Sequence, residues 1–132
     1  MHPNISKIIR IAIAVILIQT LRYKFTGHPD SVYIFETIGL EPYGRIGIGI
    51  LELIAAILIL IPKTIWIGAL MTVGLLAGAV SHHLTDLGIE INNDGGKLFY
   101  MALGTLILGL IILWDVRDQI PIIGQKLKSV QS

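Results

Sequence analysis

The stretch YGRIGIGILELIAAILILIP, residues 43–62, decides the fold, because it carries only two charged side chains, Arg45 and Glu52, before its proline. Residues 43–61 are long enough to cross a hydrocarbon core of about 30 Å at about 1.5 Å per residue. A membrane β-strand would alternate polar and apolar residues over about ten positions, and this stretch does not alternate. It therefore predicts a transmembrane helix over residues 43–61.

Three further apolar stretches predict transmembrane helices over about 5–25, 64–83 and 97–114. Only 14% of the 132 residues are charged and 54% are hydrophobic, whereas soluble domains carry about 25% charged residues. A water-soluble domain of this size could not bury so much apolar surface. We therefore predict an all-α fold, an integral membrane four-helix bundle that forms a single transmembrane domain over residues 1–132.

The connections between the predicted spans differ in character. Residues 62–64 form so short a link that the second and third helices must be antiparallel neighbours. Residues 26–42 have apolar positions that fit a short interfacial helix between helices one and two. We expect this helix to be capped by Asp30 or Ser31 and to end at Gly39.

The distribution of basic residues predicts the orientation of the bundle. With four spans, both termini and the turn at 62–64 share one side, which holds six of the ten Lys and Arg residues. Three of the six lie in the polar, basic tail after Asp115 (Arg117, Lys126 and Lys128). The other side, with segments 26–42 and 84–96, holds four. Because basic residues favour the cytoplasmic side of a membrane, we predict that both termini are cytoplasmic.

Composition also limits the partners. The net charge of +1, without a basic run, gives no reason to expect a nucleic-acid partner. The chain has no cysteine, which excludes disulfides and thiolate metal sites. The lipid bilayer is the predicted surrounding.

Glu52 is the foremost candidate for function, because it lies near the middle of the second predicted span. A carboxylate there costs several kcal/mol (about 2.5–3.5 on insertion scales) unless it is neutral, paired or hydrated. It is either a ligand-binding or proton-exchanging group, or a protonated acid that fixes helix packing. Arg45 lies seven residues earlier on the same helix face. It is either a cation at the mouth of a pocket or an interfacial anchor.

The third predicted span ends in two histidines, His82 and His83. Neighbouring helical residues point about 100° apart, so at most one of them faces the bundle. His82 shares a face with small residues at Gly78 and Ala79, and we predict that it is the inward one. Gly74 and Gly78 fit the small-xxx-small pattern of close helix packing. Two histidines without a spaced third ligand predict no metal site.

The threading of the four spans gathers polar residues at one end of the bundle. There we expect a pocket that opens outward or laterally into lipid, with Glu52 beneath; ordinary interfacial charge is the alternative. Gln19 on helix one completes the polar residues of the spans. The predicted ligand-binding residues are Glu52, His82, Lys24, Arg45 and Asp94, with His83 and Lys97 beside them.

Three short motifs in order, Lys24-Phe25-Thr26-Gly27, Gly49-Ile50-Leu51-Glu52 and Gly78-Ala79-Val80-Ser81-His82, resemble the DoxX-like family of small membrane proteins. The resemblance extends over roughly residues 8–114 and implies a four-helix protein of the bacterial inner membrane, with functional weight on Lys24, Glu52 and His82. The chain departs from the family after Gly95-Gly96, where many relatives have an acidic residue and this chain has Lys97.

The resemblance leaves two functions open. The family name descends from a subunit of a thiosulfate:quinone oxidoreductase, and other members are linked to oxidative-stress complexes. This implies a redox-associated subunit that holds a quinone-like lipophilic molecule, although a chain without cysteine, flavin motif or metal cluster is not a complete oxidoreductase. Distant relatives include NACHO, an assembly factor for nicotinic receptors. The alternative is therefore a non-enzymatic assembly or chaperone protein that recognises partner transmembrane helices, or a second copy of the chain.

Overall fold

The computed structural model describes residues 1–121, which are helical and contain no strand. Four helices are long and apolar enough to cross a membrane, which confirms the predicted fold class. Three short elements lie at the connections, and the predicted tail beyond residue 121 lies outside the described residues. The elements are α1 (Pro3–Thr26), α2 (Pro29–Thr37), α3 (Tyr43–Leu60), η1 (Pro62–Thr64), α4 (Ile65–His82), η2 (His83–Leu87), α5 (Lys97–Asp115) and η3 (Arg117–Gln119).

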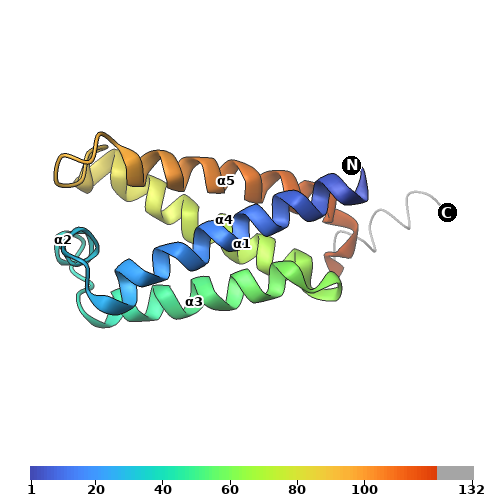
Figure 1. The fold of residues 1–132 in the computed structure, drawn as a ribbon, viewed down its shortest axis with the longest axis horizontal. Coiled ribbons are helices and arrows are strands. Elements are labelled where there is room, and N and C mark those ends of the chain that lie inside the picture. Colours follow the sequence, from blue (N-terminus) through green and yellow to red (C-terminus); the bar gives the residue numbers. More distant parts are fainter. Residues whose placement is uncertain (122–132) are drawn as a thin grey trace.

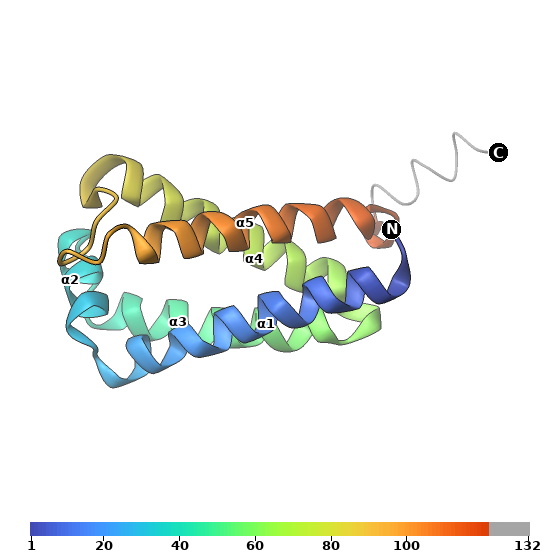
Figure 2. The same cartoon turned by 45° about the horizontal axis from the view of Figure 1, so that its top comes forward.

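The four long helices form a ring in the order α1, α3, α4 and α5. Figure 1 shows this bundle from the side. The helix pairs α1–α3, α3–α4 and α4–α5 pack extensively, whereas α1 and α5 share a smaller contact. In Figure 2, α1 and α3 lie along one side of the bundle and α5 along the other, while α4 crosses from the end of α3 toward α5. One end of the bundle holds the N-terminus and η1, and we call it the termini end; the other is the α2 end.

Glycines on α4 and α5 bring helices close together in the half of the bundle near the termini end. A Cβ added to Gly68 would overlap the backbone nitrogen of Ile59, and one added to Gly109 would lie 3.2 Å from Thr72 Cγ2. By contrast, a Cβ on Gly74 or Gly78 meets nothing within 4 Å among the described residues. The predicted packing role of Gly74 and Gly78 is therefore wrong, and the tight contacts lie one to two turns earlier on α4.

Helices α1 and α2 begin with the same local device, a histidine followed by proline. Proline suits the first turn because that backbone position needs no N–H. The histidine Nδ1 then accepts from the backbone N–H two residues later: His2 from Asn4, and His28 from Asp30, each at 3.1 Å. The expected cap at Asp30 or Ser31 is therefore wrong.

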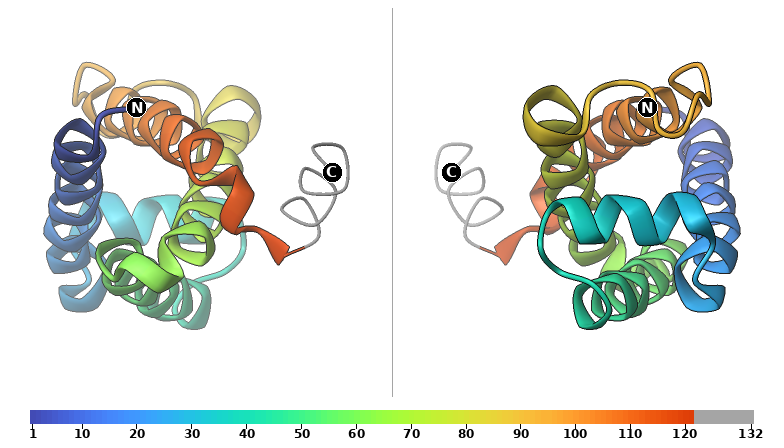
Figure 3. Two further views of the ribbon diagram at one scale, coloured as in Figure 1. Left: turned by 90° about the vertical axis from the view of Figure 1, so that its right-hand side faces the viewer. Right: turned by 90° about the vertical axis from the view of Figure 1, so that its left-hand side faces the viewer.

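Helix α2 lies across one end of the bundle and covers it (Figure 3, right). Its last residue is Thr37, and the chain turns at Gly39, whose φ of +77° only glycine adopts readily. On the other side of the bundle end, Asn92 Nδ2 donates a hydrogen bond of 2.8 Å to Asp30 Oδ1. This bond ties the α4–α5 connection to α2 and closes the end between them.

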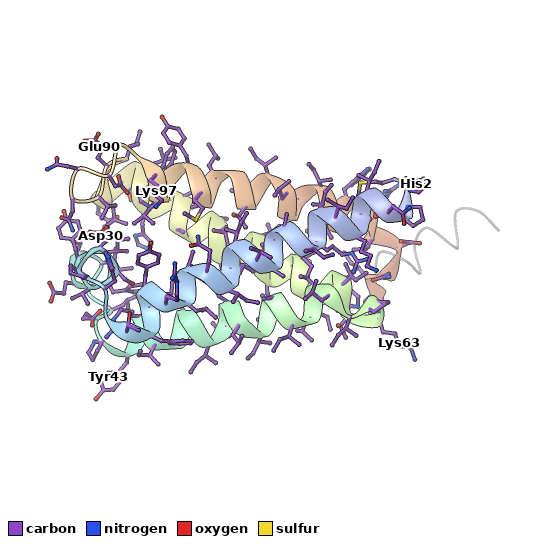
Figure 4. All side chains as sticks on the ribbon, viewed as in Figure 1. His2, Asp30, Tyr43, Lys63, Glu90 and Lys97 are labelled. Carbon is purple, nitrogen blue, oxygen red and sulfur yellow. The ribbon has the colours of Figure 1, made fainter. Side chains whose placement is uncertain are left out.

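Impermeant thiol labelling tests the orientation of the bundle. Because the chain has no cysteine, Glu90→Cys and Lys63→Cys each introduce a single thiol at an exposed position. The two positions lie at opposite ends of the bundle (Figure 4). We expect the thiol at position 90 to react in intact cells and the thiol at position 63 to react only after permeabilisation. The reverse pattern would place the termini outside.

Candidate functional site

A cavity of about 330 Å³ lies at the α2 end, enclosed by all five α-helices and the start of the α4–α5 connection. Its wall is mostly apolar. Gly74 and Gly78 form part of the wall on α4, where the backbone stands in place of a side chain. The polar residues that line it are Thr20, Tyr23, Lys24, Asp30, Ser31, Glu52, His82, His83, Asp94, Lys97 and Thr105.

An ion pair between Lys24 and Glu52 forms one side of this cavity. Lys24 Nζ lies 3.2 Å from Glu52 Oε1, with side-chain exposures of 16% and 8%. Thr20 Oγ1 lies 3.0 Å from Glu52 Oε2 and 2.7 Å from the carbonyl oxygen of Leu17. Glu52 belongs to the buried stripe of α3, with Gly49 and Ala55. Thr20 and Lys24 are one turn apart on α1, so one face of α1 supplies both partners of the carboxylate.

The pair is close to balanced in free energy. At 3.2 Å and an effective dielectric constant of about 20, its attraction amounts to about 5 kcal/mol. Removing each ion from water costs several kcal/mol, which largely cancels that attraction. Lysines near the end of a span ordinarily extend toward the headgroups, whereas Lys24 turns inward to Glu52. The pair therefore neutralises a buried charge without giving the bundle a large net stabilisation.

The two histidines are arranged opposite to the prediction. His83 is buried, with 5% of its surface exposed, and its ring packs edge-on against Phe99 at 5.6 Å between centroids. His82 also lines the cavity, but its side chain is 44% exposed and its Nδ1 lies 3.1 Å from Asp86 Oδ1. His82 as the inward histidine is therefore wrong. The cause is that His83 lies two turns after Leu76 and continues the buried stripe of α4, whereas His82 points about 100° away from that stripe.

Arg45 does not line the cavity. Its Nε donates to both carboxylate oxygens of Glu41, at 2.9 and 3.0 Å, and its Nη1 donates to the carbonyl oxygen of Lys24. That carbonyl belongs to the last turn of α1, where intrahelical partners are missing. Arg45 therefore ties α3 to the end of α1. It is neither the cation at the mouth of a pocket nor an interfacial anchor that extends to headgroups.

Asp94 organises the start of α5. Its Oδ1 accepts from the backbone N–H groups of Ile91 and Gly96, at 3.1 and 2.8 Å, and its Oδ2 from Leu98 at 3.2 Å. Burial raises the pKa of the Asp94 carboxyl, but these three backbone donors outweigh burial and place the pKa below its ordinary value. Asp94 lines the cavity, yet its carboxylate is engaged by its own loop.

The structure thus places four of the five predicted ligand-binding residues on one cavity, and their role toward a ligand stays a prediction. Sequence reasoning missed Thr20 and the inward position of His83. Both left a signal in the spacing. Thr20 precedes Lys24 by one helical turn, and His83 continues the buried stripe that α4 forms with Thr72 and Leu76.

The chemistry available at the cavity is hydrogen bonding and charge neutralisation. Over residues 1–121, no group of three or more His, Asp or Glu side chains is arranged to hold a metal ion. Lys24 supplies an ammonium with three N–H donors, and Glu52 supplies a carboxylate with acceptor sites. Such a site suits a molecule with a polar head and an apolar body.

Four apolar spans around a polar-lined cavity define the chain as a helical integral membrane protein. A family model described as DoxX matches residues 5–84, and the chain belongs to the DoxX family. The matched part contains Lys24, Glu52, His82 and His83 and ends before α5. No curated protein and no solved structure matches the chain.

Removing one partner of the ion pair should cost more than removing both. Lys24→Met leaves the Glu52 carboxylate buried without its cation, so we expect the free energy of unfolding in detergent micelles to fall by about 3 kcal/mol. The double variant Lys24→Met/Glu52→Leu removes both charges and should recover most of that loss. Equal destabilisation in the two variants would contradict an energetic coupling between Lys24 and Glu52.

The lowered pKa of Asp94 predicts an acid-sensitive loop. Its folded pKa lies below its unfolded value, so the stabilisation is complete above about pH 3.9 and is lost as the pH falls through the lowered folded value. We expect amide protection factors at Gly96 and Leu98 to drop over that acid range. In Asp94→Ala they should be low at every pH, whereas the exposed control Glu90→Ala should follow the wild type. Acid-independent protection in the wild type would contradict this role.

Proposed function

We propose that this chain binds a small lipophilic molecule with a polar head, of the quinone type, in the cavity beneath α2. In this proposal it acts as a redox-associated subunit of the bacterial inner membrane, with both termini in the cytoplasm. The observation that carries the proposal is the Lys24–Glu52 pair, which lines a cavity of about 330 Å³ inside the membrane span.

The volume supports a ligand site, because pockets for small molecules measure about 300–1,000 Å³ and are mostly apolar with a few convergent polar groups. A pair that served packing alone would have no need of a cavity beside it. Among the described residues, Glu52 is the one carboxylate paired with Lys24, and an ammonium has two further N–H donors. These donors suit a carbonyl oxygen of the ligand.

The proposed orientation of the ligand follows from the distribution of the lining residues. The head would lie beside Lys24, and the apolar body would lie against Leu98 and Met101 of α5 and the flat backbone at Gly74 and Gly78. The apolar body comes from lipid, so in this position it gains from close van der Waals contact with the wall.

Mass spectrometry of the lipophilic molecules released from gently purified protein tests this proposal. We expect a molecule enriched over the bulk lipids in the wild type and reduced about tenfold in Gly78→Leu, whose added side chain fills the cavity. Gly104→Leu is the matched control, because a Cβ there also meets nothing within 4 Å but Gly104 does not line the cavity.

The control separates loss of the site from loss of the fold. Gly104→Leu should retain the molecule as the wild type does. If the wild-type extract contains only bulk lipids, as the Gly78→Leu extract does, the cavity is empty and the binding proposal fails. Co-purification of a stoichiometric membrane partner with such an empty cavity would favour the assembly or chaperone function instead.

A further inference from the structure

A second polar group of the cavity wall, apart from the Lys24–Glu52 pair, is the imidazole ring of His83. Two contacts hold this ring in a fixed position. Its Nδ1 lies 2.9 Å from the carbonyl oxygen of Gly88, and Phe99 packs against its ring at an interplanar angle of 64°. The Gly88 carbonyl lies at the end of the π-helical turn η2, where φ of +80° at Gly88 reverses the chain. The Gly88 carbonyl and the Phe99 ring therefore fix the position of this imidazole.

The contact with Gly88 determines which nitrogen carries the proton. A carbonyl oxygen only accepts hydrogen bonds, so Nδ1 must be the donor. In the neutral ring, Nε2 then has no proton and presents a lone pair. Nε2 has no hydrogen-bond partner among the described residues. It is also not one of the fully buried polar atoms without a partner, so part of its surface is accessible. Since His83 is otherwise buried and lines the cavity, the cavity is where its lone pair is accessible.

We infer that Nε2 of His83 accepts a hydrogen bond from a hydroxyl group of the bound molecule. This inference rests on the proposed function. It adds that the cavity distinguishes a ligand with a hydroxyl group from one with only carbonyl oxygens. Lys24 donates, so it recognises a carbonyl oxygen; Nε2 of His83 accepts, so it recognises a hydroxyl. For a quinone-type ligand, the reduced quinol carries that hydroxyl and the oxidised quinone does not.

His82 does not share this property. Its Nδ1 faces Asp86 at 3.1 Å and its side chain is 44% exposed, so water competes for its ring nitrogens. The two neighbouring histidines therefore differ in environment although the residue type is the same. The control histidine is His2, which lies at the opposite end of the bundle (Figure 4) and does not line the cavity. His83→Asn is the informative variant, because its amide nitrogen can replace Nδ1 as the donor to Gly88 while no atom replaces Nε2.

Equilibrium binding of decylubiquinone and decylubiquinol to the full chain in lipid nanodiscs, under anaerobic conditions, tests the inference. We expect His83→Asn to weaken quinol binding about tenfold, a loss of about 1.4 kcal/mol, and to leave quinone binding unchanged. His2→Asn, outside the cavity, should change neither. His83→Gln, which carries an amide oxygen near the position of Nε2, should retain more quinol affinity than His83→Asn.

A second measurement does not depend on binding. The ¹⁵N chemical shifts of histidine in labelled protein at about pH 8.5, above the ordinary imidazole pKa of about 6.5, should assign the proton of His83 to Nδ1. A proton on Nε2, or equal weakening of quinone and quinol by His83→Asn, would overturn the inference while leaving the proposed function intact. Failure of the wild type to bind either form would overturn both.

Discussion

A carboxylate near the middle of a membrane span requires a cation or a proton close by, and this requirement organises the α2 end of the bundle. Glu52 is paired with Lys24 at 3.2 Å, so α1 must lie against α3, and these two helices pack extensively. The carbonyl oxygen of Lys24 lies in the last turn of α1 and accepts from Arg45, whose charge is in turn balanced by Glu41. The Lys24–Glu52 pair and the Arg45–Glu41 pair therefore both hold α3 against the end of α1.

The cavity exists because the helices are held close at one end and not at the other. Toward the termini end, Gly68 of α4 admits the backbone of α3 at Ile59, and Gly109 of α5 admits the side chain of Thr72. Toward the α2 end, Gly74 and Gly78 have no neighbour, and the space beside them is the cavity. In a bundle without water, an unfilled space beside an ion pair is costly, since the lining atoms lose their van der Waals partners. A ligand that fills the space restores those contacts.

The fold class was predictable because lipid permits few solutions: a span of apolar residues has to be a helix, and four such spans are evident in the sequence. Lys24 and Glu52 were predictable for a related reason, since charges within spans are rare. The His82 and His83 assignment failed because it followed the small residues Gly78 and Ala79, whereas the buried side of α4 is the stripe of Thr72 and Leu76, which His83 continues. The roles of Arg45 and Asp94 toward a ligand stay predictions, although Asp94 lines the cavity and Arg45 does not. Their residue types suit a ligand site, but nearby backbone groups take up their hydrogen-bonding capacity, and only coordinates reveal such competition.

Some residues of the cavity wall lie within the family match and others lie beyond it, and this has a physical consequence for ligand recognition. The part of the chain that matches the DoxX family contains both polar poles, Lys24 with Glu52 and His83. Helix α5 lies beyond the matched residues and supplies Leu98, Met101 and Ala102 to the wall. Directional hydrogen bonds tolerate little change in geometry, whereas an apolar wall accepts bodies of many shapes if the volume is conserved. In the proposed function, the head of the ligand is therefore recognised by residues within the family match, and the fit to its body depends on α5.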